Sequence, residues 1–493
     1  MSELLWTSNE WSPETLERTL EAVCKVNEEE LKLKHYPIQI EIITAEQMLD
    51  YYTSGALSTM YRHWSFGKRF ARQQEQYQKG MTGLAYEIVQ NANPNISYCM
   101  ENNSSTLQAL VMAHAGVGHN SYYYNNYFFR EWTDAEGISD YAVFARNYIA
   151  RAEEKYGLNV VSDFLDSCHA LQFNGVNRYK RPPKLNKETE KERVRARNAY
   201  LDSRLSELDM VTVWQKEQKE DKEEDDVILK HPEENILYLC EKMGNLKPWQ
   251  REIIRIVRKF GQFFYPNILS RVSNEGWAST IHFKILTRLH EKGLIDNGSY
   301  LEFLHSHSNV LYQNGFMHPR YDGFNPYKLG FSIYSDIERI CTAPTDEDKE
   351  WFPFLIGRDP WEAMVDAMSN YRDESFIRQF LSPKVIRDMR LFQIEDDTSE
   401  DYYLVKAISD KAGYEAIRNR LADMHEWFYM APNIEAVKID KTTHVLHLEH
   451  SDSMGRSLSP NVVRPMLKHL NKLWGYGVSL VDKTVSTVPE TCP

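Results

Sequence analysis

Residues 179–234 divide the sequence, because this stretch has too few apolar side chains to build a hydrophobic core of its own. Runs such as KETEKERVRAR and KEQKEDKEEDD carry a charged group at most positions. Such runs stay in contact with water as exposed helix or loop. We therefore expect a charged excursion of helix and loop here, with folded parts on either side of it at 1–178, 235–394 and 395–493. A chain of 493 residues is long enough for two or three domains.

The folded parts at 1–178 and 235–394 have the hydrophobic periodicity of helices, which predicts a large helical body. The chain enters its first helix through Trp11-Ser12-Pro13-Glu14, which offers a capping serine, an N-terminal proline and an early acid. One short strand is expected at Ile38–Ile43. Further helices are expected at 77–92, 106–119, 140–156, 248–265, 274–292, 300–310, 326–340, 360–372 and 374–381.

The part at 395–493 has a different pattern, in which short alternating segments are mixed with helical ones. Strands are expected at 402–408, 434–440, 444–450 and 478–482, and helices at 414–424 and 461–473. This β-α-β-β-α-β order is typical of a ferredoxin-like domain. The predicted fold class is therefore α+β, a large helical N-terminal body followed by a small C-terminal ferredoxin-like domain.

Composition excludes several classes of protein. The formal net charge is −13, which argues against nucleic acid as the main partner, since its phosphates call for a basic surface. The N-terminus lacks the pattern of a signal peptide, and no run approaches the roughly 18 apolar residues that span a bilayer. The six cysteines are scattered without a CxxC pair, as expected of reduced thiols. We expect a cytoplasmic protein without a membrane span.

The stretch VMAHAGVGHNSYYYNN, at 111–126, holds the first candidate site. His114 and His119 are five residues apart, which places them about 140° apart on an ideal α-helix. A π-bulge, with its i→i+5 hydrogen bonds, would bring them nearly into register, and Gly116 and Gly118 make the helix easy to deform. Alternatively, the helix ends at Gly118 and leaves His119 on a loop. Both histidines could also be structural, bonded to backbone or to the nearby tyrosines.

The stretch NEGWASTIH, at 274–282, holds the second candidate site. Glu275 and His282 are seven residues apart, so they lie on one helical face about 10.5 Å apart along the axis. Two histidines on one helix and a glutamate on a later one are the ligands of many single-zinc hydrolases. Glu275 would then be a third ligand or a general base for one divalent ion, with zinc as the first expectation. Ala115 stands where HExxH would have its glutamate, so the usual metallopeptidase motif is absent. The alternative role for Glu275 is to stabilise the helix dipole.

Other residues are weaker candidates for the same site. Tyr123 or Tyr124 could stabilise an oxyanion. Residues that could support a ligand or contact substrate are Glu87, Glu101, His282, His305 and His307. The two glutamates could equally be helix caps or surface acids, and the spacing of the last two histidines suits a strand better than one helical face. The sequence has no GxxxxGK[ST], GxSxG or GxGxxG motif, so nucleotide and serine-hydrolase chemistry lack their usual signals.

Several long motifs, in order, resemble one family. They are YRHWSFGK at 61–68, YEIVQNANP at 86–94, ALVMAHAGVGHNSYYYNNY at 109–127, WQREIIRIVR at 249–258, NEGWAS at 274–279, NPYKLG at 325–330 and FLSPKVIRD at 380–388. Together they are similar to the SpoVR family, stage V sporulation protein R and its relatives in non-sporulating bacteria. The resemblance implies a role in the spore cortex or, more generally, in stress and stationary phase. It also implies two partners, a PrkA-type serine protein kinase and a third protein of the same operon. It carries over no catalytic residues.

Two hypotheses follow from the sequence. The first is a metal-dependent hydrolase, acting on an amide or peptide bond in a cell-wall precursor or a protein. Its site would lie between 111–126 and 274–282. The second is a non-catalytic scaffold or regulatory partner of the kinase, which would dock through the C-terminal domain.

Overall fold

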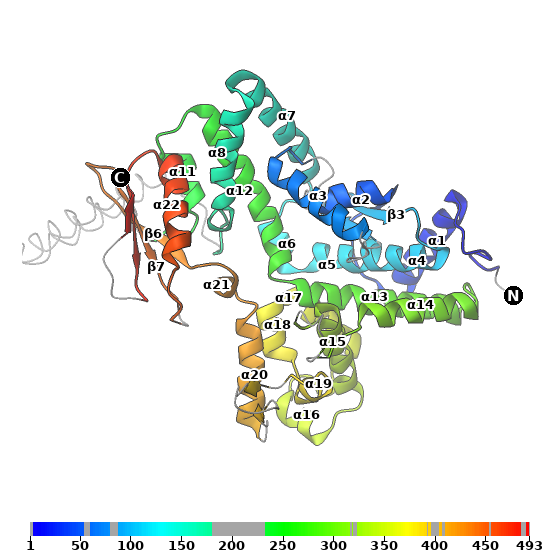
Figure 1. The fold of residues 1–493 in the computed structure, drawn as a ribbon. Coiled ribbons are helices and arrows are strands. Elements are labelled where there is room, and N and C mark those ends of the chain that lie inside the picture. Colours follow the sequence, from blue (N-terminus) through cyan, green and yellow to red (C-terminus); the bar gives the residue numbers. More distant parts are fainter. Residues whose placement is uncertain are drawn as a thin grey trace, which may run out of the picture. The chain divides into compact units, whose positions relative to one another are not determined.

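The computed structural model (Figure 1) describes residues 3–53, 60–78, 87–179, 232–315, 318, 323–391, 393–395, 404–406, 410–452, 455–484 and 490–492. The chain forms two compact units, which are described one at a time below. The body unit combines Met1–Gly157 with Phe263–Met430, and the C-terminal unit combines Leu158–Gln262 with Ala431–Pro493. This division differs from the sequence-based boundaries at 178 and 395, because segments that are distant in the sequence pack into one unit. Of the charged excursion expected at 179–234, residues 180–231 lie outside the described part.

The first half of the body unit is mainly helical, as expected. Its elements are α1 (Pro13–Val26), the π-helix η1 (Asn27–Leu31), β1 (Ile38–Ile43), α2 (Ala45–Thr53), α3 (Trp64–Gln78), β2 (Glu87–Gln90), β3 (Asn95–Met100), α4 (Ser105–Val111), the π-helix η2 (Met112–His119), α5 (Asn120–Asn125), α6 (Tyr127–Trp132) and α7 (Ile138–Tyr156). The expected start of α1 is confirmed: the hydroxyl of Ser12 accepts a hydrogen bond from the backbone N–H of Thr15, and Pro13 opens the helix.

A three-stranded sheet in this half lies next to η2. Its central strand, β3, pairs parallel with β1 and antiparallel with β2. The strand expected at Ile38–Ile43 is confirmed as β1. The helix expected at 77–92 is wrong for the described residues after 86, since Glu87–Gln90 form β2. The pairing of β2 with β3 overrides the local helical pattern.

The second half of the body unit begins near the end of α12 (Pro248–Ile268). Its elements are α13 (Arg271–Glu291), α14 (Asn297–Val310), α15 (Pro326–Thr342), α16 (Asp346–Trp351), α17 (Pro360–Asn370), α18 (Asp373–Phe380), α19 (Pro383–Asp388), β4 (Gln393–Glu395), β5 (Leu404–Lys406), α20 (Lys411–Asp423) and α21 (Trp427–Met430). The core runs along α13, which buries residues on all its sides, Trp277, Ile281, Ile285 and Leu289 among them. Its buried residues also include polar ones, Asn274, Ser279 and His282 among them, so this central helix carries polar groups into the interior.

Glycines let the helices on either side approach α13 closely. A Cβ on Gly118 of η2 would lie 2.7 Å from the Cα of Ala278, and one on Gly330 of α15 would lie 2.7 Å from the Cα of Gly276. Real Cβ atoms do not come this close to backbone, so both contacts depend on the missing side chains. The helices η2 and α15 therefore pack backbone against backbone on α13, and the first contact sets the position of the candidate site.

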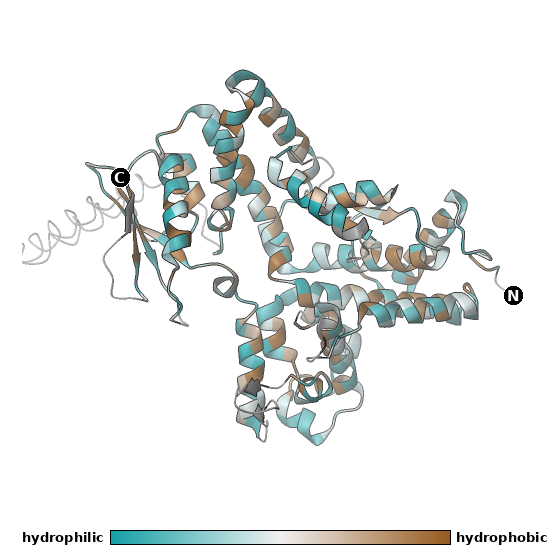
Figure 2. Ribbon diagram, in the orientation of Figure 1, coloured by the Kyte–Doolittle hydropathy of each residue, from teal (hydrophilic) through white to brown (hydrophobic). Residues whose placement is uncertain are grey.

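The C-terminal unit has a helical layer and a four-stranded sheet. Its elements are α8 (Leu158–Ala170), the 3-10 helix η3 (Gln172–Asn174), α11 (Ile236–Met243), most of α12, β6 (Ile434–Ile439), β7 (Leu446–His450), α22 (Pro460–Trp474), β8 (Val478–Asp482) and β9 (Glu490–Cys492). The strand order is β6-β7-β8-β9, with β7 and β8 parallel. Figure 2 shows teal and brown residues together on α22, whose buried side chains, Val463, Leu467 and Leu470 among them, make one apolar stripe.

The α+β class, with a helical body and a small C-terminal sheet, is confirmed. The ferredoxin-like arrangement expected within 395–493 needs a correction. Its first strand, described here as β5, pairs with β4 in a separate two-stranded sheet, and the helix expected at 414–424, α20, packs in the body unit with Leu421 and Ala422 in its core. The sheet instead takes its fourth strand from β9. The β-α-β-β-α-β order of segments along the sequence does not by itself determine which strands pair.

No helix in the described part of the chain combines the length and the apolar character that crossing a bilayer requires.

Candidate metal centre

His114 and His119 lie on one side of a continuous helix, because that helix widens into a π-helix between them. The segment η2 spans Met112–His119, and α5 continues directly from it. The ring centroids of the two histidines are 4.6 Å apart. The expected π-bulge is therefore confirmed, and the alternative in which the helix ends at Gly118 is wrong. The wider turn brings residues five apart nearly into register, as the site requires.

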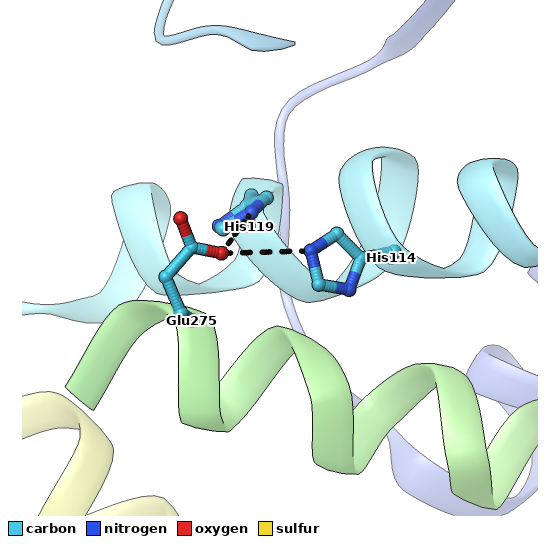
Figure 3. Close-up of side chains that lie close together, drawn as sticks. All are labelled: His114, His119 and Glu275. Atoms are coloured by element: carbon cyan, nitrogen blue, oxygen red, sulfur yellow. Dashed lines mark ion pairs between the residues drawn. The ribbon is translucent and has the colours of Figure 1, made fainter. Parts of the chain in front are cut away.

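Glu275 of α13 faces both histidines (Figure 3). Its Oε2 lies 3.3 Å from Nε2 of His119 and 3.7 Å from Nε2 of His114. One ligand atom from each of the three residues lies within 4.8 Å of the other two. The Gly118–Ala278 contact places η2 against α13 less than one turn from Glu275. The structure thus joins the two stretches that the sequence singled out, 111–126 and 274–282.

The other ring nitrogen of each histidine is occupied by a neighbour. Nδ1–H of His119 donates to Oδ1 of Asn274 at 2.9 Å, and Nδ1 of His114 lies 2.9 Å from Nδ1 of His282. If His114 donates there, then Nε2–H of His282 donates in turn to Nδ1 of His307, 2.7 Å away. Both Nε2 atoms that face Glu275 then carry free lone pairs. Histidine ligands of metals are held in this way, by a hydrogen bond to the second nitrogen.

A second carboxylate, Glu87 of β2, approaches the same histidine. Its Oε1 lies 3.8 Å from Nε2 of His114. The side chains of both glutamates are 18% exposed, and those of His114 and His119 only 3% and 7%. The carboxylate side is therefore the more exposed side of the cluster. Among the described residues, the ion pairs of both glutamates are with histidine and none is with lysine or arginine.

The charges of the cluster shift its pKa values strongly. Burial raises the pKa of Glu275, but the positive charges of His119 and His114 outweigh burial and hold that pKa well below its ordinary value. For His119, burial lowers the pKa, while Glu275 and the bond to Asn274 raise it more, so the net shift is upward. Burial dominates for Glu87 and raises its pKa. Oε2 of Glu275 is buried without a hydrogen-bond partner among the described residues. The two imidazoles and the two carboxylates are therefore close enough to shift one another's protonation.

Of the remaining candidates, some lie next to the cluster and others lie away from it. Tyr123 is buried, and its ring stacks on His119 with centroids 6.0 Å apart. Tyr124 is 37% exposed and contacts Tyr36 instead. Glu101 is exposed beyond the end of β3 and is not one of the three clustered ligand residues.

The pair His305 and His307 lies on a helix, α14, and not on a strand. Residues two apart on a helix point in nearly opposite directions. His307 is buried among Phe283, Phe303 and Phe331 and is hydrogen-bonded to His282, while His305 is exposed beside Asn309.

Asn274 is the site residue that sequence reasoning missed. Its position next to Glu275 in NEGWAS was the only available signal, because the contact with His119 crosses 155 positions.

The chain of hydrogen-bonded histidines, His114, His282 and His307, predicts that the free energy of unfolding decreases in acid. Burial, followed by the charge of His114, lowers the pKa of His307 to about 4, against about 6.5 in an unfolded chain. The neutral imidazole of His307 therefore contributes fully to the free energy of unfolding above pH ~6.5, and this contribution is lost as the pH falls toward 4. The variant His307→Gln keeps a hydrogen-bond acceptor but has no group that titrates here. As the pH falls from ~6.5 to ~4, we expect the free energy of unfolding to decrease by about 3 kcal/mol less in this variant than in wild type. Urea unfolding with a chelator present measures this difference, with His305→Gln as the matched control. A pH dependence equal to that of wild type would contradict the prediction.

Comparison with known proteins gives a consistent result. Residues 10–430 match the family model described as SpoVR like protein, and residues 432–484 match the SpoVR-like C-terminal domain. A relative, "Uncharacterized protein YcgB" of Escherichia coli (strain K12), is 46% identical over 470 residues, which cover 94% of this chain and 91% of the relative. No solved structure matches.

Proposed function

The chain belongs to the SpoVR family, and from this premise we propose that it is a metal-dependent enzyme whose centre is formed by His114, His119 and Glu275. The observation that carries the proposal is the convergence of two imidazole Nε2 atoms and one carboxylate oxygen within 4.8 Å. Two histidines and a glutamate are a ligand set of catalytic zinc sites. The ion is divalent, with zinc as the first candidate.

The surroundings of the three residues support a metal over a structural ion pair. Asn274 and His282 hold the rings of His119 and His114 through Nδ1, which directs Nε2 toward Glu275. A buried cluster with a surplus of carboxylates is stable when a cation neutralises it. Three protein ligands leave a coordination position for water or substrate, and the partly exposed carboxylate side gives access to it.

The reaction class that fits this site is hydrolysis of an amide or peptide bond. A bound zinc ion would supply a water of lowered pKa and polarise the substrate carbonyl. Asn274 and His282 orient the histidines, and Tyr123, stacked on His119, would be placed to donate to a developing oxyanion. The family resemblance favours a cell-wall precursor or a protein as substrate, in sporulation, stress or stationary phase.

The test begins with the wild-type protein, purified without an affinity tag. Elemental analysis is expected to find about one divalent metal ion per chain. Removal of the ion by a chelator is expected to abolish release of new amino groups from muropeptides or protein, and re-addition of zinc is expected to restore it. Protein that purifies without metal and binds no added zinc would contradict the proposal.

A second role, as partner of a PrkA-type serine kinase, has one observation in its favour. The segment at 432–484 matches a family model of its own and contributes no residue to the metal site. It is therefore available for docking. Binding of the purified kinase to the full-length protein, unchanged by chelation, would support this role independently of the metal. Absence of binding in both states would leave only the enzyme.

A further inference from the structure

We propose that Glu87 is a fourth protein ligand of the metal centre, so that the ion is held by two imidazoles and two carboxylates. This inference rests on the proposed function and extends it. It adds a ligand from the sheet to the three ligands from η2 and α13, and it makes Glu87 a residue that determines which metal the centre prefers.

The first argument is distance. Two carboxylate oxygens lie near Nε2 of His114, Oε1 of Glu87 at 3.8 Å and Oε2 of Glu275 at 3.7 Å. Ligand atoms bound at about 2.0–2.1 Å to one tetrahedral zinc lie roughly 3.3–3.4 Å apart. Both carboxylates are within a few tenths of an ångström of that separation from the same nitrogen. Glu87 and Glu275 therefore lie at similar distances from Nε2 of His114, while the ligand atoms that all lie within 4.8 Å of one another belong to His114, His119 and Glu275.

The second argument is that the fold fixes Glu87 without giving its side chain another role. Glu87 pairs with Cys99 of the central strand β3, and both β2 and β3 contact η2. Along β2, Ile88 and Gln90 are buried, while Glu87 and Val89 alternate with them. In the described part of the chain, the one ion pair of the Glu87 side chain is with His114. Within the described residues, strand β2 thus presents its carboxylate to His114.

The third argument is charge. Glu87 and Glu275 together carry two negative charges in a largely buried site, and no lysine or arginine in the described part of the chain makes an ion pair with them. Buried charges are normally paired with opposite charges or bound to metals. Histidines that bind a metal are neutral and supply ligand atoms without charge, so in the metal-bound state one divalent cation balances the two carboxylates.

The added ligand has a chemical consequence. Carboxylate oxygens are hard ligands that suit manganese, while imidazole suits zinc and iron. Four protein ligands fill a four-coordinate ion, so an ion that also binds substrate here must accept more than four ligands. Loss of Glu87 should therefore weaken manganese binding more than zinc binding.

The experiment is a metal titration of full-length, untagged protein in competition with a chelator, with zinc alone and with manganese alone. We expect Glu87→Gln to weaken zinc binding at least 10-fold and manganese binding more than that. The matched control, Glu101→Gln, removes an exposed glutamate beyond the end of the neighbouring strand and should keep both affinities. Wild-type affinities in Glu87→Gln, combined with loss of binding in His119→Ala, would overturn the role of Glu87 and leave the centre standing. Wild-type affinities in both variants would overturn the centre itself.

Thermal unfolding provides a second readout that a merely structural role would not produce. Without metal, Glu87→Gln removes one of two neighbouring buried carboxylates, so its unfolding midpoint should equal or exceed that of wild type. With saturating zinc, the order should reverse, because wild type binds the ion more tightly. A lower midpoint for Glu87→Gln in both states would mean that Glu87 supports the fold and would contradict a ligand role.

Discussion

Replacing His119 with alanine will reduce the metal affinity of the protein at least 100-fold and leave the purified protein with less than about a tenth of an equivalent of metal. The variant removes one of the two histidine ligands, the one whose Nε2 lies closest to Glu275, at 3.3 Å. It also removes the main positive partner of that carboxylate, so the pKa of Glu275 rises toward its ordinary value. A centre left with one histidine cannot hold zinc against a chelator.

The matched control for this result is His305→Ala. It deletes a histidine from the same body unit, but one that is exposed on α14 and bonded only to Asn309 among the described residues. Metal content and circular dichroism are measured on wild type and both variants, without an affinity tag that would itself bind metal. Full metal content in folded His119→Ala would contradict the proposed ligand set.

The second large effect is expected at the contact between α13 and α15. A Cβ on Gly330 would overlap the carbonyl oxygen of Val272 and lie 2.7 Å from the Cα of Gly276. The obstacle is backbone on both sides, so no side chain can move away and α13 itself must shift. We expect Gly330→Ala to destabilise the protein by about 3 kcal/mol or more, and to lower the metal affinity because Glu275 moves with α13.

Gly67→Ala is the matched control for the helix contact. Gly67 lies in α3, and a Cβ there would meet nothing within 4 Å. Because alanine favours a helix more than glycine does, this variant should be unchanged or more stable by about 0.5–1 kcal/mol. Urea unfolding of both variants, together with zinc titration, measures the two effects. A Gly330→Ala protein as stable as Gly67→Ala would show that the two helices are not in backbone contact.

The local pattern of the sequence predicted the helical body, strand β1 and most residues of the candidate site. Helical periodicity predicted the body, and alternation predicted β1. The glycines between His114 and His119 indicated a helix that could deform, and the structure has a π-helix there. These features depend on neighbours within a few positions, because hydrogen bonds and side-chain spacing along one helix are local properties.

Local pattern failed where the partner of a segment is distant. The stretch around Glu87 has a helical pattern, yet its last residues form β2 because β3 offers them a strand partner. The order of segments after residue 395 fits a ferredoxin-like domain, yet β5 pairs with β4 and α20 joins the core of the body unit. Strand pairing is decided by contacts between chain segments, and a single sequence does not contain them.

The sequence by itself determined the types of the site residues, their places on helices and the deformable helix that carries the histidines. Only the tertiary structure decided which of them converge. Two backbone contacts at glycines bring η2 and α15 onto α13, and this packing turns Glu275 and His282 toward His114 while Tyr124, Glu101 and His305 stay outside. The reason is that convergence across more than 150 positions depends on how helices pack, and packing is a property of surfaces that form only when the chain has folded.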